Sequence, residues 1–108
     1  MEFLVQISVK LPAEMDESAR EQLLEAEQLR GRELIEAGKI RAIWRIPGGF
    51  ENVGIWDVAD ATELHHLLTT LPLFKWLSVD TTALAKHPLS PFLMDWRDAK
   101  SSEADNSV

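Results

Sequence analysis

The sequence predicts an α+β domain in which an antiparallel sheet carries two helices on one face. Short segments with alternating apolar residues, typical of strands, are separated by segments with helical composition and helix caps. Their order is strand–helix–strand–strand–helix–strand, the split βαβ pattern of the ferredoxin-like fold, βαββαβ. With both helices on one face, the other face of the sheet is left bare, in a chain of only 108 residues. We expect this face to form a subunit interface or a ligand pocket, in an oligomer.

The first strand and the first helix make up the N-terminal third. Residues 2–10 alternate and place four apolar side chains on one face: Phe3, Val5, Ile7 and Val9. Pro12 breaks this strand because it has no N–H to donate to a ladder. A helix is predicted over residues 17–37, with Asp16 as its N-cap and Gly38 as its C-terminal stop.

A hairpin follows the first helix. Its two strands are predicted over residues 40–46 and 50–58, with the Pro-Gly-Gly turn at 47–49 between them. Simple alternation in the first of these strands gives two sets of side chains on opposite faces: Ile40, Ala42, Trp44 and Ile46 on one, and Arg41, Ile43 and Arg45 on the other.

The second half of the domain contains one helix and one strand. The helix begins after Asp60, its N-cap, with Glu63 completing a variant of the capping box, and Pro72 ends it. The last strand is predicted over residues 75–82. Residues 1–90 therefore form the predicted domain. Residues 91–108 are expected to be a C-terminal arm with an apolar patch (Phe92, Leu93, Met94 and Trp96), followed by a disordered tail over 97–108.

The composition excludes several classes of function. Eleven Lys and Arg stand against eighteen Asp and Glu, a net charge of -7, whereas nucleic-acid binding needs a basic surface. An anionic membrane surface is disfavoured for the same reason, and no apolar run approaches the roughly 18 residues of a membrane span. The N-terminal segment does not resemble a signal peptide, so we expect a cytoplasmic protein. The absence of cysteine excludes thiol nucleophiles and thiolate metal sites.

Glu27 is the first candidate for chemistry. It lies on the apolar stripe of the predicted first helix, together with Leu23, Leu24, Gly31 and Leu34. Partial desolvation raises the pKa of a carboxyl group at such a position and suits it to proton abstraction near neutral pH. Gly31, one turn further on, leaves room for a ligand. The alternative is structural: Glu27 reaches the helix edge or forms an ion pair with Arg30, Arg41 or Arg45.

Trp44 and Arg45 are the next candidates. An arginine on a strand otherwise rich in Ile and Trp can bind a substrate carboxylate through two hydrogen bonds, although an interface salt bridge explains it equally well. Adjacent strand residues point to opposite faces, so both side chains line one pocket only at an edge or a bulge.

Metal and cofactor sites are not predicted. His65 and His66 are adjacent on a helix and point about 100° apart, so they cannot chelate one ion together. The chain has neither a phosphate-binding loop nor a Gly-x-Gly-x-x-Gly motif. Either acid–base chemistry without a cofactor remains, or the chain carries out no chemistry at all.

Short motifs follow one another in a specific order and spacing along residues 1–88. They are VKLP at 9–12, MD at 15–16, the helix with Glu27, WRI at 44–46, Asn52, DV at 57–58, LH at 64–65, LPLF at 71–74 and HP at 87–88. In these residues the chain resembles the muconolactone Δ-isomerase family. The resemblance implies a ferredoxin-like fold, dimers that assemble into a decamer, pockets at subunit interfaces, and a cytoplasmic role in the β-ketoadipate pathway of aromatic hydrocarbon catabolism.

The resemblance also implies a reaction and roles for named residues. Muconolactone becomes 3-oxoadipate enol-lactone when one proton moves between two ring carbons, and a single carboxylate can carry that proton. Glu27 is the expected carrier, Arg45 binds the acetate arm or stabilises the dienolate, and Asn52 or His65 donates to the lactone oxygen. Three aromatic side chains are expected to wall the ring: Trp44, Phe74 and Trp76.

Two positions depart from the family pattern and leave the substrate open. Leu4 stands where a histidine is expected, and Phe50 where an aromatic hydroxyl is expected. One alternative is a chloromuconolactone dehalogenase, which loses chloride after the same proton abstraction. The other is a non-catalytic oligomeric module with the same fold, which would tolerate Gln at position 27.

Overall fold

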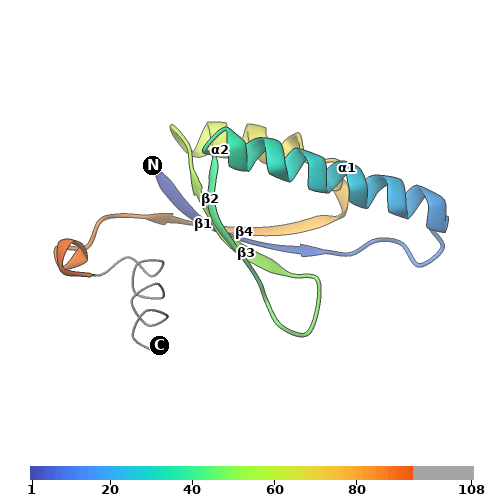
Figure 1. Cartoon of the computed structure of the whole chain (residues 1–108), viewed down its shortest axis with the longest axis horizontal. Helices are drawn as coiled ribbons and strands as arrows, with labels where there is room; N and C mark the ends of the chain where they lie inside the picture. The colour runs from blue at the N-terminus through green and yellow to red at the C-terminus, as the bar shows by residue number, and fades with distance from the viewer. Residues whose placement is uncertain (94–108) are drawn as a thin grey trace, which may run out of the picture.

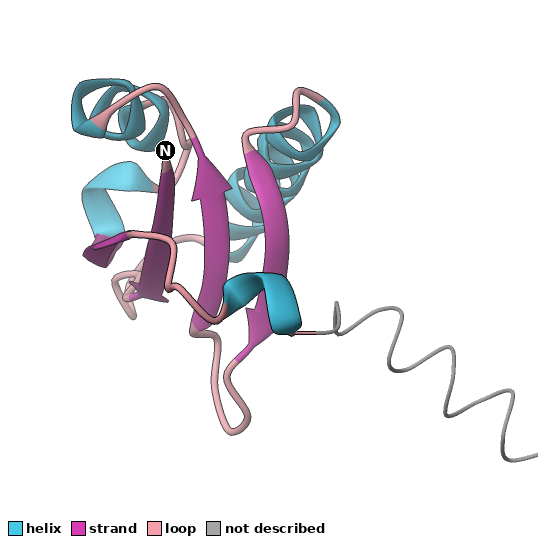
Figure 2. Ribbon diagram, turned by 90° about the vertical axis from the view of Figure 1, so that its left-hand side faces the viewer, coloured by secondary structure: helices cyan, strands magenta, loops and turns pink. Residues whose placement is uncertain are grey.

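The computed structural model describes residues 1–93 and has the predicted α+β architecture. Four antiparallel strands form one sheet in the order β2-β3-β1-β4, and α1 and α2 lie together on one face of it (Figures 1 and 2). The elements are β1 (Glu2–Val9), α1 (Glu17–Glu36), β2 (Ile40–Arg45), β3 (Asn52–Asp57), α2 (Ala61–Thr69) and β4 (Leu77–Leu84), with short 3₁₀ helices η1 (Phe74–Trp76) and η2 (Ser90–Phe92). This order and sheet topology confirm the ferredoxin-like prediction.

The core lies between the sheet and the two helices. On β1 the alternation predicted from the sequence buries Phe3, Val5 and Ile7 on the helix side. Apolar residues of both helices pack against them, with Leu34 from α1 and Leu64 from α2 almost fully buried. Each such side chain contributes about 1.5–3 kcal/mol through the water-exposed area it loses. The core therefore fixes both helices on the same face.

The ends of α1 follow the predicted caps. The Asp16 carboxylate accepts a hydrogen bond from the Ala19 N–H at 3.3 Å, as an N-cap does. At the other end Gly38 has φ +77°, the left-handed conformation that glycine adopts without steric cost. The Lys39 N–H then donates to the Leu34 carbonyl at 2.9 Å and turns the chain into β2.

The face assignment predicted for β2 is wrong because the strand contains a bulge. Ile40 pairs with Trp56, but Ala42 already pairs with Ile55, so one extra residue, Arg41, is inserted. Ile40 therefore lies on the helix side, and the alternation restarts after it. Ala42 and Trp44 occupy the opposite face, while Ile43 and Arg45 return to the helix side. Period-two counting cannot detect such an insertion.

The fourth strand begins later than predicted. Residues 74–76 form η1, in which the Phe74 N–H donates to the Leu71 carbonyl at 2.9 Å and the Trp76 N–H to the Leu73 carbonyl at 2.8 Å. These local hydrogen bonds coil the segment that alternation assigned to the strand. β4 then runs to Leu84, beyond the predicted end at residue 82. The third strand is shorter than predicted at both ends, over Asn52–Asp57.

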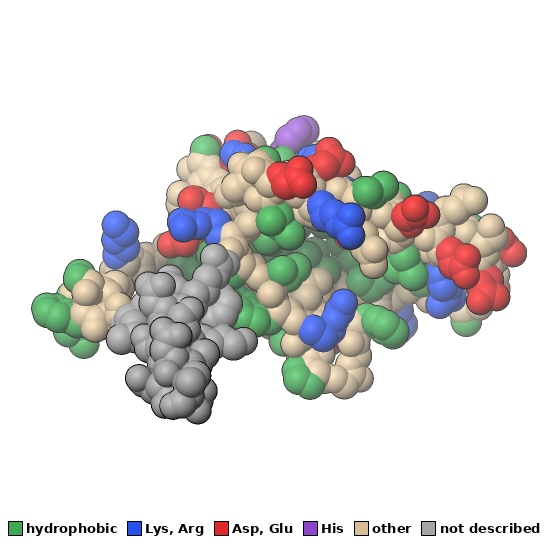
Figure 3. Space-filling model, in the orientation of Figure 1, with side chains coloured by type: hydrophobic (Ala, Val, Ile, Leu, Met, Phe, Trp, Pro, Cys, Tyr) green, Lys and Arg blue, Asp and Glu red, His purple; other side chains and the backbone are tan. Residues whose placement is uncertain are grey.

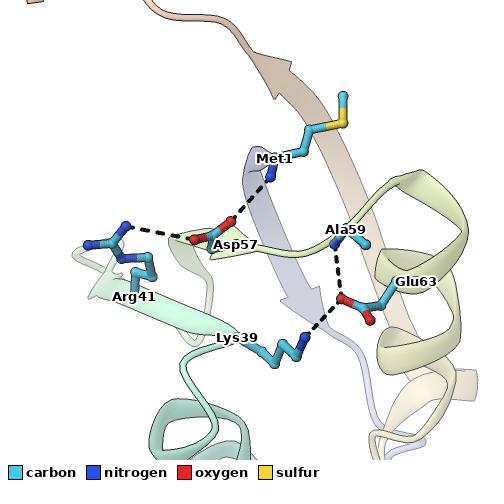
Figure 4. A network of polar contacts seen from close by, with 6 residues as sticks. All are labelled: Met1, Lys39, Arg41, Asp57, Ala59 and Glu63. Atoms are coloured by element: carbon cyan, nitrogen blue, oxygen red, sulfur yellow. Dashed lines mark hydrogen bonds and ion pairs between the residues drawn. The ribbon is translucent and has the colours of Figure 1, made fainter.

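Two polar clusters lie next to each other, one at the start of α2 and one at the end of β3 (Figure 4). The Asp60 carboxylate accepts from the Glu63 N–H at 2.8 Å, which confirms the predicted N-cap. The Glu63 carboxylate accepts from the Ala59 N–H and from Lys39 Nζ, both at 3.0 Å. In the second cluster, Asp57 binds the N-terminal ammonium of Met1 at 3.3 Å and Arg41 at 3.7 Å.

Glu63 gives the folded chain a pH-dependent contribution to stability. Its hydrogen bonds with Ala59 and Lys39 lower the pKa of the carboxyl group. A lowered pKa in the folded state favours folding above the pKa of the unfolded chain, and this contribution is lost as the pH falls through the folded value. We expect Glu63→Gln to lower the Tm at neutral pH, with the difference from wild type vanishing in acid. Thermal unfolding of both proteins from pH 7 to 3 measures this; a constant difference would contradict it.

Apolar side chains also lie on the sheet face away from the helices and in the segment after β4. Register places Leu4, Trp44, Val53 and Ile55 on that face, where Trp44 is exposed and the other three are half-buried. Beyond β4, the chain leads to η2 at the end of the molecule away from the start of α1 (Figure 1), where Phe92 is 83% and Leu93 76% exposed. Met94, Trp96 and the tail predicted over 97–108 lie outside the described residues. Within residues 1–93 no helix is both long and apolar enough to cross a membrane.

Candidate functional site

Glu27 lies in the middle of α1 and faces the segment that joins α2 to β4. Its Oε1 accepts a hydrogen bond from the Leu73 N–H at 3.0 Å. The side chain is half-buried, whereas Glu25 and Glu33 on the same helix are exposed. Acidic side chains are spread over the outer surface of α1 while apolar ones gather beneath it (Figure 3). Glu27 is thus a carboxylate on the inner side of an otherwise solvated acidic helix.

The surroundings of Glu27 favour its protonated form. Desolvation by burial raises the pKa of the carboxyl group above its ordinary value of 4.5, and the Leu73 N–H offsets only part of this increase. Among residues 1–93 no basic side chain forms an ion pair with Glu27. Arg30 pairs with Glu33 and Arg41 with Asp57. The ion pairs with Arg30, Arg41 or Arg45, which were the structural alternative for Glu27, are therefore not formed.

Aromatic groups stand next to the segment that holds Glu27. Phe74 directly follows Leu73, and its ring meets the ring of His65 from α2 edge to face, with centroids 6.4 Å apart. Trp76 is half-buried, and Lys75 Nζ lies 4.6 Å from the centre of its ring. Leu73, Phe74 and His65 are thereby brought together near one end of the helix layer. His65 and His66 are both exposed, and residues 1–93 contain no cluster of three potential metal ligands.

Arg45 and Asn52 form a second group, at the hairpin end of the sheet. They pair with each other across β2 and β3 and share the helix side, the side on which Glu27 lies. Asn52 is half-buried, while the Arg45 guanidinium is exposed and donates through Nη1 to the Glu51 carbonyl at 3.4 Å. This long contact leaves the guanidinium with hydrogen-bond donors for a further partner.

Trp44 is not brought to the Glu27 side. It pairs with Val53 on the opposite face of the sheet, where it is 41% exposed. Because a four-stranded sheet separates the two faces, Trp44 and Glu27 of one chain cannot line the same pocket. Trp44 as a wall of the substrate pocket stays a prediction, and it requires a second subunit.

One chain does not enclose Glu27. The structure contains a cavity of about 360 Å³, lined by Ser8, Val9 and residues 46–51 at the hairpin, and Glu27 is not part of it. Near Glu27 the helix carries Gly31, where an added Cβ would meet no heavy atom within 4 Å. The space that the sequence predicted at Gly31 is therefore present.

Two groups at this site were not predicted from the sequence. The first is the Leu73 N–H, a backbone group in the segment after α2, which no residue type in the sequence identifies as a hydrogen-bond donor to Glu27. The second is the contact between Arg30 Nε and Thr70 Oγ1 at 3.0 Å, which joins α1 to the end of α2. No sequence pattern signals this contact, because the two residues are forty positions apart.

Comparisons with known proteins identify relatives of this chain by sequence and by fold. Residues 1–90 match the family model described as muconolactone delta-isomerase. The chain is 39% identical over 90 residues to the muconolactone delta-isomerase of Acinetobacter baylyi, covering 83% of this chain and 94% of the relative. It is 38% identical over 85 residues to that of Rhodococcus opacus, covering 79% and 91%. A crystal structure of muconolactone isomerase superposes with a TM-score of 0.79 at 36% identity, over 88% of this chain and 98% of the other.

Proposed function

The chain belongs to the muconolactone delta-isomerase family, and from this membership we propose that it isomerises muconolactone to 3-oxoadipate enol-lactone. The relatives are covered over more than nine-tenths of their length, so the proposal concerns the whole catalytic domain, residues 1–90. We place the reaction in the cytoplasm, in the β-ketoadipate pathway of aromatic catabolism. The single observation that carries the proposal is the half-buried Glu27 carboxylate, which forms no ion pair with any basic side chain of residues 1–93.

The reaction moves one proton and one double bond. A base removes the proton from the ring carbon that bears the acetate arm. The electron pair left behind forms a dienolate, whose negative charge rests on the carbonyl oxygen of the lactone. Returning a proton to the ring carbon next to the carbonyl gives the enol-lactone. Atoms and electrons balance without an oxidant or a co-reactant, so one group that accepts and then releases a proton is sufficient.

Glu27 is suited to carry this proton in both directions. Its desolvation raises the pKa of the carboxyl group, which makes the carboxylate a stronger base for the first step. The Leu73 N–H occupies Oε1, and Oε2 is the oxygen that exchanges the proton with the substrate. The hydrogen bond to a backbone N–H also fixes the carboxylate in one orientation during both steps.

The anionic parts of the substrate need donors. Arg45 binds the acetate arm or the dienolate, and its exposed guanidinium supports either role. Asn52, paired with it across the hairpin, or His65 donates to the lactone oxygen. One preorganised donor of this kind contributes about 3–4 kcal/mol to the transition state. Phe74 and Trp76 wall the ring on the η1 side.

The complete pocket is shared between subunits. A second chain is needed to bring a Trp44 to the helix side, and exposed apolar residues on the free sheet face and at Leu89, Phe92 and Leu93 suit such contacts. We propose that dimers assemble into a decamer and that the arm after residue 90 docks on a neighbour. Light scattering measures the mass directly; a monomer at assay concentration would contradict the shared pocket.

Incubation with two lactones tests the function. Muconolactone should disappear with the appearance of the enol-lactone, followed by ultraviolet absorbance and by proton NMR. With 5-chloromuconolactone, chloride release should stay far slower than isomerisation of muconolactone. Chloride release as the faster reaction would instead assign a dehalogenase. If neither lactone is converted by the folded, assembled protein, the proposed function is wrong.

A further inference from the structure

Arg30 lies in the position from which a cation would normally neutralise Glu27. Residues three apart on a helix are neighbours, and a glutamate and an arginine at that spacing commonly pair. In this structure the guanidinium is directed elsewhere. Arg30 Nε donates to Thr70 Oγ1 at 3.0 Å, and Nη1 contacts Glu33 Oε2 at 3.5 Å. The pairing expected from spacing is replaced by a contact with the end of α2.

Thr70 is oriented to accept this contact. It is the C-cap of α2, where its backbone N–H donates to the Leu67 carbonyl at 3.1 Å. The hydroxyl hydrogen also points to the Leu67 carbonyl, at 2.6 Å, so the hydroxyl oxygen presents its lone pairs to the guanidinium. Three residues later, the Leu73 N–H binds Glu27. The end of α2 thus holds Arg30 and Glu27 on two separate partners.

We propose that Thr70 is a positioning residue, whose hydroxyl holds the Arg30 guanidinium away from the Glu27 carboxylate so that the proton carrier has a backbone N–H but no cation as its partner. This inference rests on the proposed role of Glu27 in isomerisation. Thr70 itself touches neither the substrate nor the reacting atoms, and it acts through Arg30.

The electrostatic consequence has a definite sign. A cation within about 4–6 Å of a carboxylate stabilises the charged form and lowers the pKa by about 1–3 units, which would weaken Glu27 as a base. Other cationic groups on the surrounding elements are already engaged or are exposed. Lys75 lies over Trp76, Arg45 bonds to the hairpin, and His65 packs edge to face on Phe74. Arg30 is therefore the group whose release would alter Glu27.

The test is a set of variants assayed for kcat/KM against pH with muconolactone. Thr70→Val keeps the shape of the side chain but removes its hydroxyl. The acid limb of the pH profile should then shift to lower pH by about 1 unit. The plateau above it should fall severalfold, because the carboxylate is less basic. Thr70→Ser retains the hydroxyl and should keep the limb at its wild-type position. Adding Arg30→Met to Thr70→Val should return the limb to that position. The ¹³C shift of the Glu27 carboxyl group, assigned by its absence in Glu27→Gln, should titrate in parallel.

The outcomes separate this inference from the proposed function. An unshifted limb in Thr70→Val, or a shift that Arg30→Met does not reverse, overturns the role of Thr70 while Glu27 remains the proton carrier. Near-normal activity of Glu27→Gln overturns Glu27 as the proton carrier, and with it this inference, while the isomerase function stands. Failure of the wild-type protein to convert muconolactone overturns the proposed function itself. If Thr70→Val does not assemble, Thr70→Ala removes the same hydroxyl with less bulk, and the carboxyl titration is measured on that variant.

Discussion

Replacing Glu27 by Gln is expected to lower kcat for muconolactone at least about a hundredfold while the fold and the assembly remain unchanged. Glutamine has the same shape, and its amide oxygen can still accept from the Leu73 N–H that binds Oε1 at 3.0 Å. It cannot carry a proton between two carbons. Initial-rate assays give kcat, while circular dichroism checks the fold and light scattering checks the mass of the oligomer.

Glu25→Gln is the matched control for this variant. Glu25 lies on the same helix, two residues away, and is exposed. The substitution changes the net charge by the same amount, so electrostatic effects on an anionic substrate should be similar. We expect kcat for Glu25→Gln to stay within about twofold of wild type, as for surface changes generally. Near-normal turnover by Glu27→Gln would eliminate Glu27 as the proton carrier.

Replacing Gly54 by Ala should destabilise the fold by about 3 kcal/mol or prevent assembly. Gly54 is buried in β3 beside the bulge of β2. A Cβ built there would lie 2.6 Å from the carbonyl oxygen of Ala42, a backbone atom that cannot rotate away. The two strands would have to separate, and they carry Asn52 and Arg45. Urea or thermal unfolding at fixed protein concentration measures the loss.

Gly49→Ala provides the comparison for Gly54→Ala. Gly49 lies in the hairpin turn, where an added Cβ meets nothing within 4 Å and φ is not in the left-handed region. Its unfolding free energy should change by no more than about 0.5 kcal/mol. Equal stability of Gly54→Ala and Gly49→Ala would show that the strands adjust to the extra carbon, contrary to the contact described above.

Local signals in the sequence were sufficient for most of the fold. Asp16, Gly38 and Asp60 mark helix ends through their own chemistry, and the alternation in β1 identifies its buried face. The bulge at Arg41 was not predictable in this way, because it depends on pairing with β3. The helix η1 was missed because alternation does not reveal the local turn hydrogen bonds that form it. The bulge also affects the candidate site, because it places Ile40 on the helix side of the sheet together with Ile43 and Arg45.

The candidate site was predictable where a charged residue occupies a position at which helical periodicity predicts an apolar one. Glu27 stands out because a carboxylate on an apolar stripe is unusual. Its partner Leu73 acts through a backbone N–H, and the Arg30–Thr70 contact spans two helices, so neither has a signature in residue type. Trp44 shows a further limit, since a residue on the far face of the sheet can reach the pocket only through another subunit.

The stereochemistry of proton return in deuterium oxide tests most directly whether one carboxylate carries the proton. Glu27 approaches the ring from one side, so it must remove and return the proton on the same face. Deuterium enters the product in those turnovers in which the Glu27 carboxyl proton exchanges with the solvent before it is returned. We predict that this deuterium lies in the new ring methylene on the face from which the original proton left, as read by NMR of the product. Delivery of deuterium to the opposite face would require a second acid and would contradict a single Glu27 proton shuttle.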